Sequence, residues 1–116
     1  SVAAGEVEDA IAILMGQGLD ASVNAMKTVS KLVKNIIKTP EEEKFRRIRL
    51  NNQAFNSKVV SIQGGMELMQ AIGFNVDTTG EEPFFVFPES QLQGQNRLII
   101  ADQKLQAAMD LLDSQI

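Results

Sequence analysis

The chain has 116 residues, of which 44% are hydrophobic and 22% charged, so it is long enough to bury one domain core. It contains no cysteine and no histidine, which excludes disulfides, thiol nucleophiles and the commonest zinc ligands. No apolar run is long enough to span a membrane. Because the chain opens at Ser1 rather than at methionine, we expect a piece of a longer protein. A cytoplasmic setting is the expectation, with a nuclear one as the alternative.

The net charge of -4 is unevenly distributed along the chain. The window from Lys27 to Lys58 holds nine of the eleven basic residues and only three acids, so it carries +6 while the remainder carries -10. Polarised charge of this kind steers association with a partner of opposite sign. Lys27, Lys31, Lys34 and Lys38 follow one line of a predicted helix. Their alternative role is a solvated helix face.

Two helices are predicted in the first third of the chain. Residues 6–15 carry apolar residues at helical spacing, and the glycines after them end that helix. Asp20 is the expected N-cap of a second helix over residues 21–38. The apolar positions of the two helices are Val7, Ala10, Ile11 and Leu14, then Val23, Met26, Val29, Leu32, Val33, Ile36 and Ile37.

A third helix is predicted to start at the Thr39–Pro40 step. Proline suits the first helical position, and Thr39 with Glu42 matches the capping-box spacing. The acids that follow would lie at the positive end of this helix and the arginines nearer its negative end. One side of the helix would carry Phe45, Ile48 and Arg49, with Asn52 two turns after Phe45.

The remaining elements are shorter, apart from a closing amphipathic helix. Gly73 is expected to cap the helix before it, and the prolines that bracket the second hairpin strand favour an edge position. The predicted segments are a helical turn at 53–58, a strand at 59–62, a helix at 66–72, hairpin strands at 74–76 and 84–88, and a helix at 97–116. The prediction is one mostly helical α+β domain over residues 1–116, with a small antiparallel sheet of about three strands. Its core spans about 20–112, and residues 1–19 form a helical extension.

The sequence favours a binding module over an enzyme. A nucleophile–base pair of the usual kind cannot be assembled without histidine or cysteine. The runs Glu41–Glu43 and Glu81–Glu82 are expected to be solvated rather than catalytic. No glycine pattern fits a phosphate loop. We therefore expect no catalytic residue, no metal and no cofactor.

The segment from Thr39 to Phe74, "TPEEEKFRRIRLNNQAFNSKVVSIQGGMELMQAIGF", closely resembles the core of the PUB (or PUG) domain. This family is known from peptide N-glycanase, UBX-containing cofactors and the catalytic subunit of the linear-ubiquitin ligase. Single pieces of its pattern are weak, but the ordered set with its spacing kept is specific. The matching positions are Asn35, Pro40, Glu43, Lys44, Phe45, Arg46, Ile48, Arg49, Asn52, Phe55, Gly64, Leu68, Gly73, Phe74, Phe87 and Pro88.

The resemblance implies a non-catalytic adaptor in ubiquitin-dependent and ER-associated degradation. Its implied partner is the acidic C-terminal tail of the valosin-containing AAA ATPase, which has leucine and tyrosine near its end. A pocket for a similar internal motif, such as one in a deubiquitinase, is the alternative within the family. The family's peptide-binding positions fall on Asn35, Lys44, Phe45, Arg49, Asn52, Gly73 and Phe74.

The chemistry of these side chains suits an acidic peptide, although each has another possible role. A guanidinium binds a carboxylate in two-pronged fashion, carboxamides meet a peptide backbone, and a phenyl ring forms an apolar wall. Asn35 could instead cap its helix, Phe45 could be core, and Arg49 could pair with Glu42 or Glu43. The pair at Asn51 and Asn52 could mark a turn. Peptide N-glycanase has tyrosine where Phe45 stands, which puts fine specificity in question but keeps the wall.

Two other classes of function compete with this interpretation. The basic window could bind nucleic acid, but phenylalanine is the only aromatic type and the net charge is negative. The chain could instead be a structural or self-associating domain, in which the methionine-rich and terminal helices pair between copies. We expect no nucleic acid and no membrane as partners, and a monomeric domain.

Overall fold

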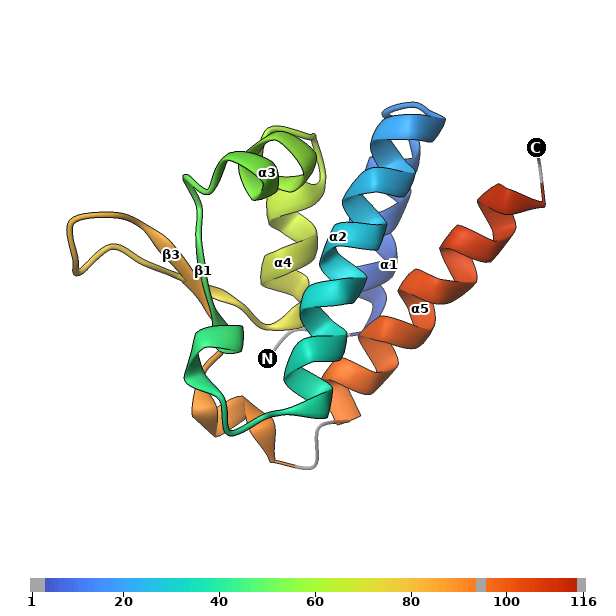
Figure 1. Ribbon diagram of the computed structural model, residues 1–116. Helices are drawn as coiled ribbons and strands as arrows, with labels where there is room; N and C mark the ends of the chain where they lie inside the picture. Colours follow the sequence, from blue (N-terminus) through green and yellow to red (C-terminus); the bar gives the residue numbers. More distant parts are fainter. Residues whose placement is uncertain (1–3, 94–95, 115–116) are drawn as a thin grey trace.

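The computed structural model describes residues 4–93 and 96–114. Within them the chain forms five α-helices and a three-stranded antiparallel sheet, which confirms the predicted fold class (Figure 1). The helices are α1 (Ala4–Met15), α2 (Leu19–Lys38), α3 (Gln53–Phe55), α4 (Gly65–Ile72) and α5 (Asn96–Asp113). The strands are β1 (Arg47–Arg49), β2 (Asn75–Asp77) and β3 (Phe84–Val86), and the shorter turns are the 3₁₀ segments η1 (Glu43–Arg46) and η3 (Glu89–Leu92) and the π-helical η2 (Asn56–Val60).

The helices form the larger part of the molecule, and the sheet lies to one side of them (Figure 1). Helix α2 packs against α5, and α1 packs against α4 and α5. The apolar stripes predicted for the first two helices are confirmed, because Val7, Leu14, Met26 and Ile36 are all buried. An amphipathic helix is stabilised mainly by burying one face in this way.

The hairpin predicted between residues 74 and 88 is confirmed, but its second strand is not at an edge. Strand β3 lies between β1 and β2, and it pairs antiparallel with both. The two prolines tolerate this position because they bracket the strand without entering it. Pro83 even contributes, since its carbonyl oxygen accepts a hydrogen bond from the N–H of Leu50 at 3.1 Å.

Four buried phenylalanines join the sheet to the helices. The Phe85 ring, in the central strand, makes edge-on contacts with Phe55 at 6.1 Å and with Phe74 at 6.4 Å between centroids. Phe74 in turn contacts Phe87 at 5.3 Å. These distances lie within the favourable range for aromatic pairs.

The start of α2 differs from the prediction. Gly18, with φ of 99°, is the N-cap residue, and Asp20 lies in the first turn instead. The reversal between α1 and α2 requires a positive φ at this point, which glycine adopts without strain. The Gly18 carbonyl then accepts the first bond of the helix, from the N–H of Ser22 at 3.0 Å.

The helix predicted from Thr39 onward was wrong. The Thr39 N–H donates to the carbonyl of Asn35 and closes α2, and the chain then forms η1 and β1. The local capping pattern is overridden because Arg47–Arg49 pair with β3, a partner far away in sequence. The strand predicted at residues 59–62 was also wrong. The Ser61 N–H donates to the carbonyl of Asn56 at 2.8 Å, which leaves Val59 in a π-helical turn with its side chain buried.

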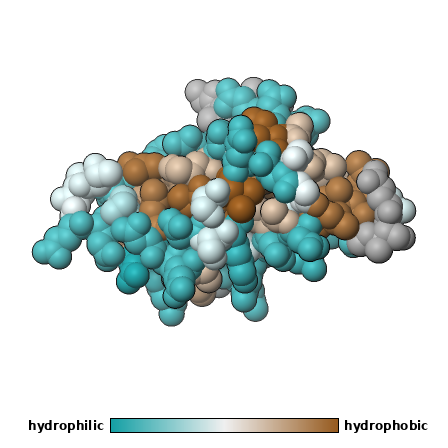
Figure 2. All heavy atoms as spheres, turned by 90° about the horizontal axis from the view of Figure 1, so that it is seen from above, coloured by the Kyte–Doolittle hydropathy of each residue, from teal (hydrophilic) through white to brown (hydrophobic). Residues whose placement is uncertain are grey.

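The surface mixes polar and apolar side chains. On the face shown in Figure 2, hydrophobic residues form a broken band across a largely hydrophilic surface. Isolated exposed apolar side chains are ordinary on monomeric domains. The described helices include none that is long and apolar enough to cross a membrane. The large exposed hydrophobic residues are Ile13, Leu19, Val76, Ile99, Ile100 and Leu111.

Replacing Gly65 by alanine tests the close packing at the start of α4. A Cβ atom there would overlap the carbonyl oxygen of Val59 and lie 2.7 Å from its carbonyl carbon. We expect Gly65→Ala to lower the free energy of unfolding by about 2–4 kcal/mol, measured by urea denaturation. Gly80→Ala is the control, because no atom lies within 4 Å of its added Cβ. Equal stability of the two variants would contradict this packing.

Candidate functional site

Four of the seven predicted site residues lie on the segment from η1 to the start of α3. Lys44 and Phe45 are in η1, Arg49 ends β1, and Asn52 is the N-cap of α3. Asn35 comes from α2, which packs against η1. The five side chains make no hydrogen bond or ion pair with one another among the described residues. The contacts of Arg49 and Asn52 are instead with other residues, Glu82 and the backbone N–H of Phe55.

Phe45 is both part of the core and part of the surface. Its ring is half-buried and packs against the hydrophobic core. The Lys44 ammonium lies over the same ring, 5.6 Å from its centroid. A ring that packs on the core and has a cation over it offers a partly apolar surface with a positive charge beside it.

The Arg49 guanidinium faces the loop of the hairpin. Its Nε lies 3.8 Å from a carboxylate oxygen of Glu82, and the two side chains are 50% and 46% exposed. An exposed pair at this distance is weak, so an incoming carboxylate can replace Glu82. The sequence suggested Glu42 or Glu43 as partners, and Glu82 was missed. It could not be recognised because β1 was not predicted to pair with β3.

The neighbouring Arg47 is held on the outer face of the sheet. Its guanidinium lies over the Phe84 ring at 4.5 Å and 3.9 Å from an oxygen of Asp77. Hydrogen bonds from the hydroxyl and N–H of Thr79, with a smaller effect of Arg47, lower the pKa of the Asp77 carboxyl. Arg47 therefore contacts side chains of both hairpin strands, whereas Arg49 faces the loop that joins them.

Asn52 has a structural role in addition to any ligand contact. Its side-chain oxygen accepts a hydrogen bond from the N–H of Phe55 at 3.0 Å, so the turn signal read from the asparagine pair is confirmed. The exposed side chain keeps its amide NH₂ without a hydrogen bond to any described residue. Asn35 differs, because its backbone carbonyl rather than its side chain closes α2.

Gly73 and Phe74 lie beneath the surface. Phe74 is only 1% exposed, and a Cβ at Gly73 would lie 3.0 Å from the ring of Phe87. Gly73 has a φ of 128° and ends α4, as predicted. Phe74 contacts Phe85, which pairs with Ile48 between the two arginines of β1. Gly73 through its backbone and Phe74 through its ring can therefore support the site from below rather than line it.

The positive surface is smaller than the sequence indicated. Arg46 is 9% exposed, and its guanidinium points inward, with one NH group 3.5 Å from the Phe87 carbonyl oxygen. Arg47, Arg49 and Lys34 each face an acidic side chain. Five lysines of the basic window are exposed and make no ion pair within residues 4–93 and 96–114: Lys27, Lys31, Lys38, Lys44 and Lys58.

Residues 19–99 match the PUB domain, so the chain belongs to the PUB domain family. The matched part begins with α2 and includes every predicted site residue, while α1 and most of α5 lie outside it.

Among curated proteins, the chain is 41% identical over 63 residues to UBX domain-containing protein 6 of Caenorhabditis elegans, covering 54% of this chain and 14% of that protein. It is 31% identical over 78 residues to plant UBX domain-containing protein 2 of Arabidopsis thaliana, covering 66% and 16%. It is 28% identical over 85 residues to human peptide-N(4)-(N-acetyl-beta-glucosaminyl)asparagine amidase, covering 73% and 12%. The matched region is thus under a fifth of each relative's length.

Removing the Asn52 side chain should destabilise the domain, in addition to removing any contact that the side chain makes with a ligand. We expect Asn52→Ala to lower the free energy of unfolding by about 1 kcal/mol, because the Phe55 N–H loses its acceptor. Asn52→Ser keeps a capping oxygen and should restore most of that loss while removing the carboxamide. Chemical denaturation of the three proteins checks this, and an unchanged stability of Asn52→Ala would contradict the capping role.

Proposed function

We propose that this domain is a non-catalytic, monomeric adaptor that binds the acidic C-terminal tail of the valosin-containing AAA ATPase. It would connect its parent protein to ubiquitin-dependent and ER-associated degradation, in a cytoplasmic setting with a nuclear one as the alternative. The observation that carries the proposal is the grouping of Phe45, Arg49 and Asn52 on one short segment of a PUB domain. One apolar wall, one guanidinium and one carboxamide are the groups that a short acidic peptide needs.

Each proposed contact follows from the chemistry of the side chain. Arg49 would bind a tail carboxylate, for which the geometry of a guanidinium is suited. Asn35 and Asn52 would hydrogen-bond the peptide backbone, since a carboxamide both donates and accepts. Phe45 would contact the leucine or tyrosine side chain, with Lys44 as a charge at the rim.

The two buried positions would act indirectly. Gly73 lets α4 turn into β2, and Phe74 packs under Phe85 in the central strand. We assign them the support of β1 and its Arg49 rather than direct contact with the peptide. Substituting either would then change binding together with stability.

A titration with the tail peptide tests the proposal. We expect a tail peptide of about ten residues to bind the isotope-labelled domain with micromolar affinity, near -7 to -8 kcal/mol, with NMR shift changes of the domain centred on Phe45, Arg49 and Asn52. Arg49→Ala should weaken binding about tenfold or more, because it removes a charge-assisted hydrogen-bond donor. Lys58→Ala is the control, since it also removes one exposed basic side chain.

No shift in a folded sample of the wild-type domain would overturn the tail proposal. Shifts at the same residues only with an internal motif from another partner would replace the ATPase by that partner. Shifts spread over the exposed apolar residues of α1 and α5, with a rise in mass by light scattering, would indicate self-association instead.

Neutralising Glu82 should strengthen binding. Its carboxylate faces Arg49 at 3.8 Å and competes with any acidic peptide. We expect Glu82→Gln to lower the Kd about two- to fivefold, the range for one exposed ion pair. Glu81→Gln makes the same charge change one residue away and should have a smaller effect. If both variants behave alike, the gain reflects net charge and not release of Arg49.

A further inference from the structure

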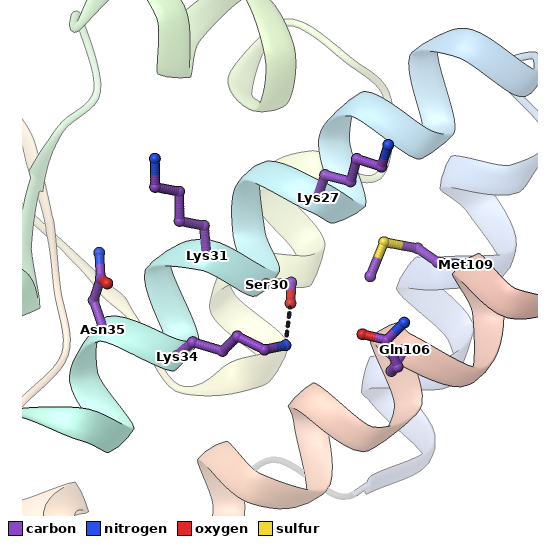
Figure 3. A pocket seen from close by; sticks show the side chains of 7 residues that line it. All are labelled: Lys27, Ser30, Lys31, Lys34, Asn35, Gln106 and Met109. Carbon is purple, nitrogen blue, oxygen red and sulfur yellow. Dashed lines mark hydrogen bonds between the residues drawn. The ribbon is translucent and has the colours of Figure 1, made fainter.

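A groove between α2 and α5 shares one residue with the proposed tail site. It has a volume of about 420 Å³, within the size range of small ligand pockets. Asn35 lies at one end of the groove and also belongs to the tail site, so the two surfaces are continuous. The lining residues are Lys27, Ser30, Lys31, Lys34, Asn35, Gln106 and Met109 (Figure 3).

The lysines of α2 that line this groove differ in their pairing. The Lys34 ammonium lies 2.9 Å from Asp102 of α5 and donates to the Ser30 hydroxyl at the same distance, so its charge is paired across the two helices. Lys27 and Lys31 on the α2 wall of the groove are exposed and pair with no acid among residues 4–93 and 96–114.

The α5 side of the groove has the opposite character. Gln106 donates a hydrogen bond to Asp110 at 3.2 Å, which places an acidic side chain next to that wall. Met109 adds an apolar surface. An acidic ligand would therefore be drawn to the α2 wall and repelled from the α5 wall.

From Asn35 in the tail site, Lys31 and then Lys27 follow along α2 toward its N-terminus. Lys31 and Asn35 point to the same side of the helix, while Lys34 reaches back toward Ser30 (Figure 3). From Lys27 to Asn35 the helix rises about 12 Å. An extended peptide advances about 3.3 Å per residue, so this row matches about four residues.

We infer that Lys27 and Lys31 bind an acidic segment of the partner that lies immediately upstream of the tail residues held at Phe45 and Arg49. This inference rests on the proposed function. Because the tail ends at its own C-terminus, only its upstream side can continue onto α2. Lys27 and Lys31 are then specificity determinants. They favour tails with aspartate or glutamate in the upstream residues over tails of equal length with neutral residues at those positions.

Binding of two peptides separates this role from the tail site itself. The short peptide has the last five or so residues of the tail, and the extended peptide adds about four aspartates upstream. We expect the wild-type domain to bind the extended peptide about three- to tenfold more tightly, a gain that falls at high salt. In Lys27→Gln/Lys31→Gln the gain should disappear while the affinity for the short peptide stays the same.

Two controls decide the outcome. An extended peptide with asparagine in place of aspartate should bind with the affinity of the short peptide. The Lys58→Gln variant should bind the extended peptide as much more tightly than the short one as the wild-type domain does, whereas the matched Lys31→Gln variant should not. A gain that persists in the double variant, or that Lys58→Gln reduces equally, would overturn the inference while tail binding stands. Failure of the wild-type domain to bind either peptide would overturn the proposed function and this inference with it.

Discussion

The packing of Phe85 between the sheet and the helices is the constraint on which the candidate site depends. Each strand has only three residues, too few for a sheet of this kind to be stable by itself. Phe85 sits in the central strand, contacts Phe55 and Phe74, and pairs across the sheet with Ile48. By fixing Ile48 on the core side, this cluster turns both flanking arginines outward. The position of Arg49 is therefore set by aromatic packing rather than by the weak ion pair at its tip.

The fold was predictable from the sequence where an element is determined by the spacing of its own apolar residues. Helices α1, α2, α4 and α5 each bury one face, and their apolar spacing revealed them. The segment after Thr39 has equally clear helix signals, yet it forms only the short 3₁₀ turn η1 and then β1, because Arg47–Arg49 pair with β3. Val59 and Val60 favour a strand by composition but lie in a π-helical turn, since Val59 is buried against the helices. Both errors arose where contacts distant in sequence outweighed local preference.

The residues of the candidate site were supplied by the family resemblance, whereas their geometry depends on contacts between segments that are distant in sequence. The family resemblance named Asn35, Phe45, Arg49 and Asn52, and family membership is confirmed by the match over residues 19–99. The contact of Glu82 with Arg49 had no local signal, because it joins β1 to the hairpin loop, whereas the capping bond of Asn52 lies within the turn that the asparagine pair indicated. These contacts give two of the proposed binding groups a second task inside the free domain. Binding would then exchange one set of interactions for another, which keeps affinity moderate and reversible.

The close contact between Gly64 and α1 bears on where this domain begins as a physical unit. A Cβ at Gly64 would lie 2.9 Å from the Leu14 backbone nitrogen, and Leu14 itself is fully buried. Gly64 is within the part that matches the family, whereas Leu14 precedes it. The packed core therefore extends beyond the residues that match the family. A fragment trimmed to residues 19–99 would keep every proposed contact residue but would expose the apolar surfaces that α1 and the rest of α5 cover. Loss of binding by such a fragment would therefore report on its folding before it reported on its recognition of a partner.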